Sequence, residues 1–473
     1  MQIGLDDVAQ AALDACWAQL ESKRWINDRR TRMFDGKYKA RHLGIAVPPQ
    51  LEKVETTLMW PAKAVEALES LINLEGYVIP DGTSADFGLD AIWRENRLGI
   101  EATQAHVSAL KYGVAFLAVL AGDAARGEPD VVIRNLSPVS STAIWDPILR
   151  RVTSALTVIS SARMNGVFQP VDFILFLDDR VITATLVDSK WNVDERPHDL
   201  RRCPIAVLPF KPSIEEPLGR SRITRGVMTI TERVARTLLR MEISAEFFSA
   251  QQRYALGADE DSFVGANGEK KSGWEVTIGR MLILGRDEDG NVPTVGQFPQ
   301  TSMQPHVDMV RSDAALFAGE TNIPVSALGI IHDNPASDAA MQSAYMALYS
   351  EAERSWEPFG AGWVDAMQMA VTIRDGGLPD ELLGLRAKWA RVDTPTMAAR
   401  GDFIAKQIAA FPWMAKSDVA LEESGYDQTT VDRLRADRQR MQAADRLASV
   451  LSAVKQPTQA TPVAIAATAT GAA

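Results

Sequence analysis

RSRITRGVMTITERVARTLLRMEISAEFFSAQQ, residues 220–252, has no proline or glycine after Gly226 and therefore predicts a helix of about eight turns. Its apolar residues recur at spacings of three and four, which places them on one helical face: Ile223, Val227, Ile230, Val234, Leu238, Met241, Ala245 and Phe248. Five arginines fall on a different stripe: Arg222, Arg225, Arg233, Arg236 and Arg240. Such a helix offers an apolar face to a neighbour and a cationic strip to an acidic partner, although most charged stripes are only solvated surface.

The composition indicates a folded protein of ordinary character. A chain of 473 residues predicts roughly two to four sub-domains, and 46% apolar and 23% charged residues are typical of soluble proteins. The net charge of −11 argues against a nonspecific nucleic-acid coat, but it leaves room for local basic strips. Cys16 and Cys203 lie far apart, which indicates no disulfide framework and fits a reducing compartment. MQIGLDDVAQ lacks the features of a signal peptide, so we expect a soluble cytoplasmic product.

The pattern along the chain predicts an α+β fold that is mainly helical. Helical periodicity marks residues 5–27, 60–74 and 89–112. From Val114 to Phe210 short β-branched and aromatic segments predict one sheet-containing lobe, with a hairpin turn at Asp178–Arg180. Beyond the long helix we expect a polar excursion, a short apolar segment at 274–284, a helix at 303–317, and a long helix that begins at Ser337 and is kinked at Pro358. The end of the chain is predicted to be helical, followed by a disordered Ala/Thr/Pro tail at 455–473.

No motif for catalysis is complete. Gly265 precedes Lys271-Ser272 at the spacing of a phosphate-binding loop, but Lys270 occupies the position of the second glycine. Acidic pairs such as Asp259 and Asp261 lack the further ligands of a calcium loop. The five histidines are scattered along the chain. We therefore expect no catalytic residue, no metal site and no cofactor.

Several strings, in the same order, resemble the portal proteins of tailed bacteriophages, particularly those of siphophages of actinobacteria. The most specific string is PLGRSRITRGVMTITERVARTLLRMEISAEFFSAQQRYALG, and others are IWRENRLGIEATQAHVSALKYGVAF and VGQFPQTSMQPHVDMVRSDAALFAGETNIPVSALG. DRRTRMFDGKYKA and DNPASDAAMQSAYMALYSEAERSWEPFG complete the set, so the resemblance spans about residues 20–450. Phe34-Asp35 stands where the family usually has paired tyrosines.

The resemblance implies a portal-type fold with a wing (1–215 and 286–377), a stem helix (216–250), a clip (251–272), a second stem segment (273–285) and a crown (378–454). It places a tunnel loop at 328–336, with these residues at the channel: Ile330, Ile331, His332, Asp333, Asn334 and Pro335. The clip residues implied to dock partners are Asp259, Asp261, Glu269, Lys270 and Lys271.

The resemblance also implies a homo-oligomeric ring, of about twelve copies, around a central channel. The implied protein is a non-enzymatic conduit for double-stranded DNA during packaging and ejection, which nucleates capsid assembly at one vertex of the virion. Its implied partners are the terminase large subunit, the major capsid and scaffolding proteins and the head–tail adaptor protein. Membranes are not among them, and assembly is expected in the host cytoplasm.

Two interpretations of the arginine stripe stay open: pairing with acidic groups on the next subunit, or facing the duplex. We favour pairing between subunits, because a strongly cationic channel lining would hold DNA by counterion release and slow its passage. Two other functions are alternatives. One is an enzyme with a site assembled from dispersed carboxylates, such as Asp259, Asp261 and Glu269, and the other is a capsid or scaffold component without a channel.

Overall fold

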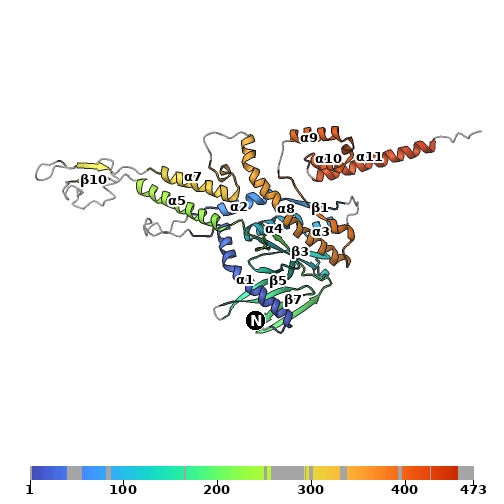
Figure 1. The fold of residues 1–473 in the computed structure, drawn as a ribbon, viewed down its shortest axis with the longest axis horizontal. Helices are drawn as coiled ribbons and strands as arrows, with labels where there is room; N and C mark the ends of the chain where they lie inside the picture. Colours follow the sequence, from blue (N-terminus) through green and yellow to red (C-terminus); the bar gives the residue numbers. More distant parts are fainter. Residues whose placement is uncertain are drawn as a thin grey trace, which may run out of the picture. The chain divides into compact units, whose positions relative to one another are not determined.

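The computed structural model describes residues 3–39, 56–80, 87–164, 167–249, 253–256, 292, 294–297, 302–330, 338–392, 397–426 and 428–455. The chain divides into two compact units, Met1–Val392 and Asp393–Ala473. Both helices and strands build the first unit, and the second unit is helical (Figure 1). The predicted α+β, mainly helical class is confirmed. None of the described helices is long and apolar enough to cross a membrane.

A five-stranded antiparallel sheet, in the order β4-β5-β6-β7-β8, lies against the first helix. Its strands are β4 (Ser141–Asp146), β5 (Arg151–Met164), β6 (Val167–Phe176), β7 (Arg180–Val187) and β8 (Lys190–Pro197). Since β6 ends at Phe176 and β7 begins at Arg180, the predicted hairpin turn is confirmed. Helix α1 (Asp7–Phe34) covers this sheet with Leu13, Cys16 and Leu20, and it continues past the predicted end at residue 27.

A second, three-stranded antiparallel sheet has the order β3-β2-β9, so the predicted single lobe contains two sheets. Its strands are β2 (Val114–Ala121), β3 (Val131–Leu136) and β9 (Ile205–Pro209). Successive side chains of a strand point to opposite faces of the sheet. Strand β2 is apolar without interruption because both of its faces are buried. Ala115, Leu117 and Val119 enter one hydrophobic cluster, whereas Val114, Phe116 and Ala118 enter another.

The largest cluster of buried apolar residues lies among helices that pack on this second sheet. Besides α1, the described helices of the first unit are α2 (Trp60–Glu69), α3 (Leu89–Glu95), α4 (Leu98–Tyr112), α5 (Arg225–Ser249), α7 (Gln304–Thr321) and α8 (Asp338–Asp375). Pro358 lies inside α8, which continues to Asp375, and the predicted N-cap Ser337 is outside the described residues. Short 3-10 turns occur at Ala124–Arg126, Val325–Leu328 and Asp380–Gly384.

Helices α5 and α7 run side by side and project from the body of the first unit (Figure 1). Near their far ends β10 (Arg253–Leu256) and β11 (Thr294–Gln297) form a two-stranded antiparallel sheet. The two helices therefore form a helical hairpin whose base rests on the main hydrophobic cluster.

A two-stranded sheet closes the first unit and corrects one predicted boundary. Strand β1 (Leu74–Val78) pairs antiparallel with β12 (Arg386–Trp389), and Leu74 lies opposite Trp389. Leu382, Leu385 and Val392 are buried in the main cluster. The separate C-terminal unit therefore begins at Asp393, and not at residue 378 where the predicted crown starts.

The second unit contains α9 (Met397–Ala410), a 3-10 turn at Pro412–Lys416, α10 (Asp418–Glu423) and α11 (Gln428–Lys455). Ser417 caps α10, because its hydroxyl accepts a hydrogen bond from Val419 N. The predicted helical end is confirmed for this unit, and the predicted tail beyond Lys455 lies outside the described residues.

Candidate functional site

Helix α5 has two opposite faces, as its sequence predicts. Val227 and Val234 are buried in the main hydrophobic cluster of the first unit. Arg225, Thr229, Arg236 and Arg240 lie on the other side of the helix, where burial is lower. Of the predicted apolar residues, Ala245 is exposed, which shows that the buried face ends before the far end of the helix.

Two ion pairs fix α5 to its own subunit. The Arg233 guanidinium donates two hydrogen bonds to the carboxylate of Asp313 on α7, and Nε lies 3.0 Å from Oδ2. Asp313 is buried, so the bidentate pair joins the two helices of the hairpin. On the neighbouring side Glu232 accepts a hydrogen bond from Arg29 of α1 at 3.0 Å. The first pair joins the two helices of the hairpin, and the second joins α5 to α1.

Close backbone approach fixes the chain just before α5. Gly219 has a φ of +82°, and a side chain there would come within 2.4 Å of Gly113 O. Phe210 N donates to Gly113 O at 2.8 Å, and Arg220 N donates to Phe210 O at 2.7 Å. Only glycine tolerates both this φ and this close contact. The hydrogen bonds hold the segment before α5 against Phe210, just after the end of β9.

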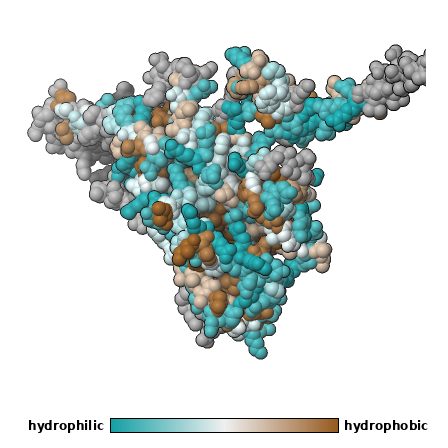
Figure 2. Space-filling view, turned by 45° about the vertical axis from the view of Figure 1, so that its right-hand side comes forward, coloured by the Kyte–Doolittle hydropathy of each residue, from teal (hydrophilic) through white to brown (hydrophobic). Residues whose placement is uncertain are grey.

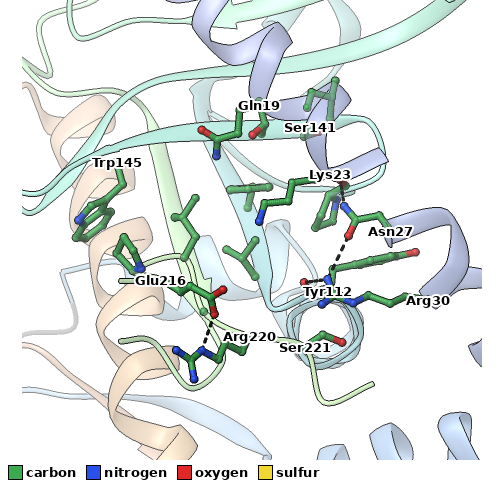
Figure 3. Close-up of a pocket in the computed structure, with 18 of the residues that line it drawn as sticks. Gln19, Lys23, Asn27, Arg30, Tyr112, Ser141, Trp145, Glu216, Arg220 and Ser221 are labelled. Carbon is green, nitrogen blue, oxygen red and sulfur yellow. Dashed lines mark hydrogen bonds and ion pairs between the residues drawn. The ribbon is translucent and has the colours of Figure 1, made fainter. Parts of the chain in front are cut away.

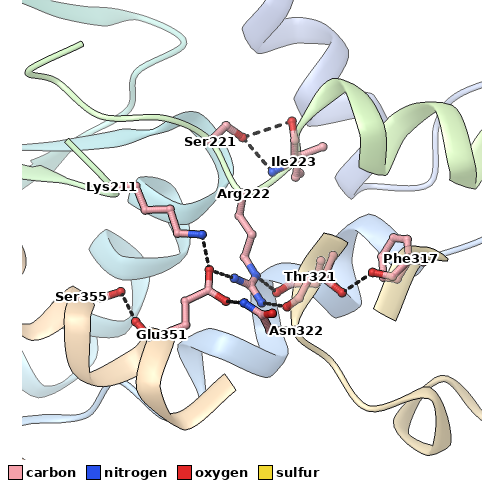
Figure 4. A network of polar contacts seen from close by, with 10 residues as sticks. Lys211, Ser221, Arg222, Ile223, Phe317, Thr321, Asn322, Glu351 and Ser355 are labelled. Atoms are coloured by element: carbon pink, nitrogen blue, oxygen red, sulfur yellow. Dashed lines mark hydrogen bonds and ion pairs between the residues drawn. The ribbon is translucent and has the colours of Figure 1, made fainter. Parts of the chain in front are cut away.

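At the base of the hairpin a buried arginine connects four segments (Figure 4). Arg222 is 4% exposed, and its Nε donates to the carbonyl oxygen of Ala64 in α2 at 2.6 Å. Its Nη1 donates to Glu351 Oε1 of α8 at 2.6 Å, and its Nη2 donates to Thr321 O at the end of α7 at 2.5 Å. The guanidinium therefore ties the start of α5 to α2, α7 and α8.

Glu351 also contacts Lys211 and Asn322. Lys211 Nζ lies 2.5 Å from Oε1, and Asn322 Nδ2 donates to Oε2 at 2.9 Å. Burial raises the pKa of Glu351, but the charge of Arg222 and the hydrogen bonds from Arg222, Lys211 and Asn322 outweigh it and hold the pKa below its usual value. Burial lowers the pKa of Arg222, whereas the negative charge of Glu351 opposes this shift. Both groups are therefore charged, and their hydrogen bonds compensate for the loss of hydration on burial.

The structure places the predicted arginines in two groups. Arg222 precedes α5 and is buried within its own subunit, so the prediction that it meets another subunit or DNA is wrong for this residue. Arg233 is engaged with Asp313 of its own chain. Arg225, Arg236 and Arg240 make no ion pair with any residue that the structure describes, and their pairing partner stays a prediction.

Of the other predicted site residues, one lies among the described residues. Ile330 is half-buried and packs against the main cluster. The rest of the predicted tunnel loop, the clip residues and the predicted second stem segment lie outside the described residues: Ile331, His332, Asp333, Asn334, Pro335, Asp259, Asp261, Glu269, Lys270, Lys271 and 274–284.

Sequence reasoning missed Asp313 and Glu351, which lie 80 and 129 residues from their arginine partners, and Lys211, which pairs with the distant Glu351. Each is a single charge in an unremarkable local pattern. The one available signal was indirect, because Arg222 falls next to Ile223 at the apolar edge of the helix pattern.

A cavity of about 610 Å³ lies beside this region, between α1, the end of α4 and the segment that leads into α5. Figure 3 shows Lys23 and Gln19 of α1 on one wall and the Glu216–Arg220 pair on the other. Its lining includes no histidine or cysteine, and its charges are of both signs. Among the described residues, no three histidine, cysteine or carboxylate side chains gather as a metal site would need.

The family model described as "Phage portal protein, SPP1 Gp6-like" matches residues 13–391. The chain is 26% identical to the portal protein of Mycobacterium phage L5 over 391 residues, which are 80% of this chain and 77% of that protein. It is 24% identical to the portal protein of Mycobacterium phage D29 over 441 residues, which are 91% of this chain and 89% of that protein.

Among solved structures, a chain in the virion of a native gene transfer agent particle matches with a TM-score of 0.43 and 14% identity, covering 81% of this chain and 89% of that chain. The family match covers most of the chain and confirms the resemblance seen in the sequence. The chain belongs to the SPP1 Gp6-like family of phage portal proteins, a structural rather than a catalytic family.

Proposed function

We propose that this chain assembles into a ring at one capsid vertex, through which double-stranded DNA passes during packaging and ejection. In this proposal the ring nucleates the capsid and docks the terminase, the capsid and scaffolding proteins and the head–tail adaptor. Family membership and the α5–α7 hairpin support it. The observation that carries it concerns α5: one face is fixed to its own subunit, while Arg236 and Arg240 form no ion pair with any of the described residues.

The unmatched arginines fit a contact between subunits better than a contact with DNA. Arg225, Arg236 and Arg240 lie on one face of α5, opposite the buried Val227 and Val234. A ring built from one kind of chain repeats a heterologous contact, so this face meets a different face of the next copy. A cationic lining would retain the duplex by counterion release, whereas a chain with a net charge of −11 has many acidic groups to pair with these arginines.

The predicted tunnel loop at 328–336 keeps its place in this proposal as the narrowest part of the channel. It follows α7 and precedes α8, the two helices that the Arg222–Glu351 network ties together. The network therefore ties the end of α7 at Thr321 to the middle of α8 at Glu351. In this proposal the predicted clip at 251–272 docks the terminase and the head–tail adaptor.

The test is a charge reversal on the unmatched face. Arg236→Glu with Arg240→Glu should shift the purified full-length protein from rings to monomers in sedimentation velocity, because the contact changes from attraction to repulsion. Arg126→Glu with Arg196→Glu is the control, since it changes the net charge equally at two exposed arginines of the first unit. Ring formation that equals the control would refute the proposed contact.

A further inference from the structure

Arg30 of α1 is a half-buried arginine whose charge no described carboxylate balances. The buried Arg222, by contrast, lies against the carboxylate of Glu351. Both hydrogen bonds that the Arg30 side chain makes with described residues start from Nη1 and end on neutral groups. Their acceptors are Tyr112 O at 2.9 Å and Asn27 Oδ1 at 3.4 Å. The positive charge of Arg30 is therefore partly removed from water without a negative partner.

The other edge of this guanidinium is suited to a carboxylate. Nε of Arg30 is buried and donates no hydrogen bond to a described residue. Burial lowers the pKa of Arg30, and the negative charge of Glu216 opposes this shift only in part. A carboxylate can accept hydrogen bonds from Nε and Nη2 of one arginine together, as Asp313 does with Arg233 in this chain. Arg30 keeps the same two donors available.

Arg30 lines the cavity of about 610 Å³ between α1, the end of α4 and the segment before α5 (Figure 3). Lys23, seven residues earlier on the same face of α1, lines this cavity too and makes no ion pair with the described part of the chain. Ser141 and Thr142 are 3% and 5% exposed and add hydroxyl groups to the wall. Two cations therefore face one cavity of the size that holds a small ligand.

The charges of the lining favour a ligand with a single negative charge. The cations Lys23, Arg30 and Arg220 stand against the carboxylates Glu215 and Glu216, which leaves one positive charge. Glu216 is paired with Arg220 at 2.5 Å. A phosphate dianion or a nucleic-acid backbone would bring more negative charge than this lining balances, and the two carboxylates would repel it. One carboxylate matches the lining.

The rest of the lining favours an apolar body on that ligand. Leu20, Phe116 and Trp145 line the cavity, and Trp145 is only half-buried. Ile148 and Ile214, which lie within three residues of lining residues in the chain, are 89% and 97% exposed. Figure 2 shows hydrophobic groups of this kind between hydrophilic ones on the surface of the first unit. An aromatic or aliphatic group can therefore leave water against this part of the cavity.

We propose that this cavity binds a carboxylate on an apolar or aromatic body. The carboxylate lies between Lys23 and Arg30, and the body lies against Trp145. A free organic acid and an acidic side chain of a docking protein segment share this chemistry, and the test distinguishes the two sources. The proposal does not depend on the ring, since every lining residue belongs to one copy of the chain.

The test titrates two probes onto the full-length protein and follows binding by ligand-observed NMR. N-acetyl-phenylalanine is a free acid on an aromatic body, and acetyl-Leu-Glu-Phe-amide carries one acidic side chain between apolar residues. Each is compared with a neutral counterpart in which an amide replaces the carboxylate. At least one acid should bind with a dissociation constant on the order of 1 mM. It should bind about tenfold more tightly than its neutral counterpart, because the carboxylate supplies charged hydrogen bonds.

Matched lysine variants link this preference to the cavity. Lys23→Met should lose most of the preference for the acid, since it removes one of the two cations from an exposed position of α1. Lys190→Met makes the same change at an exposed lysine of β8 outside the lining and should keep the preference.

Binding of the tripeptide alone would assign the carboxylate to a protein segment, binding of the free acid alone would assign it to an organic acid, and binding of both supports the shared chemistry. Three results would overturn the proposal: no binding of either acid at about 10 mM, tenfold above the expected constant, equal binding of acids and neutral counterparts, or an unchanged preference in Lys23→Met.

Discussion

Arg222 is the residue on which the attachment of the hairpin depends. Its removal leaves Glu351 as a buried carboxylate without its main partner, so Arg222→Ala should lower the free energy of unfolding by about 3–5 kcal/mol. Arg220→Ala, two residues away, removes an exposed pair with Glu216 and should cost less than about 1 kcal/mol. Urea unfolding of both variants measures the difference. Equal midpoints for the two variants would show that the buried network adds nothing to stability.

His106 gives the first unit a predictable response to acid. It is 1% exposed, accepts a hydrogen bond from Trp363 Nε1 at 3.0 Å and stacks on Phe359. Burial lowers the pKa of His106 to about 3, while in the unfolded chain it is about 6.5. Between these values the unfolded chain binds a proton that the folded one excludes, so stability falls by roughly 1.4 kcal/mol per pH unit as the pH drops.

His106→Gln tests this, because a glutamine oxygen can still accept from Trp363 but does not titrate. Between pH 6.5 and pH 5 the free energy of unfolding should fall by a smaller amount in the variant than in the unaltered chain. The same slope in both proteins would mean that His106 is not the group responsible.

At the scale of elements, α8 meets the second sheet at a point where only glycine fits. A side chain at Gly362 would come within 2.1 Å of Val207 O in β9, whereas one at Gly360 would meet Ala387 and Trp389 at ordinary distances of 3.4–3.5 Å. Gly362→Ala should therefore destabilise the first unit by about 1–3 kcal/mol. Gly360→Ala in the same helix should be neutral or stabilising, because alanine favours helix over glycine. Thermal unfolding compares the two, and a tolerated Gly362→Ala would contradict the packing described here.

Elements with a clear local pattern were predictable from the sequence. The apolar face of α5, the strand-rich segment from β2 to β9 and the helical end follow from periodicity and turn residues. The pairing of β1 with β12 was not predictable, since it joins Leu74 to Trp389 and no local signal specifies the partner of a short strand. The same limit explains why Arg222 was assigned to an exposed stripe, because its partner Glu351 is 129 residues away.

At the scale of the whole molecule, the two units differ in how much of their apolar surface they bury. The first unit has a core that reaches from α2 to α8 and β12 and includes residues of the α5–α7 hairpin. The second unit exposes the apolar surface that its helices would be expected to bury. We therefore expect the first unit to fix the geometry of the ring, while the second is completed by assembly.

The most direct test of the proposed ring is the mass of the purified full-length protein, measured by light scattering coupled to size exclusion. We predict a species of about twelve copies of the 51.7 kDa chain, close to 620 kDa. It should persist on dilution, because each copy contacts two neighbours. A monomer or dimer that persists across salt and protein concentration would contradict the ring, and with it the conduit for DNA.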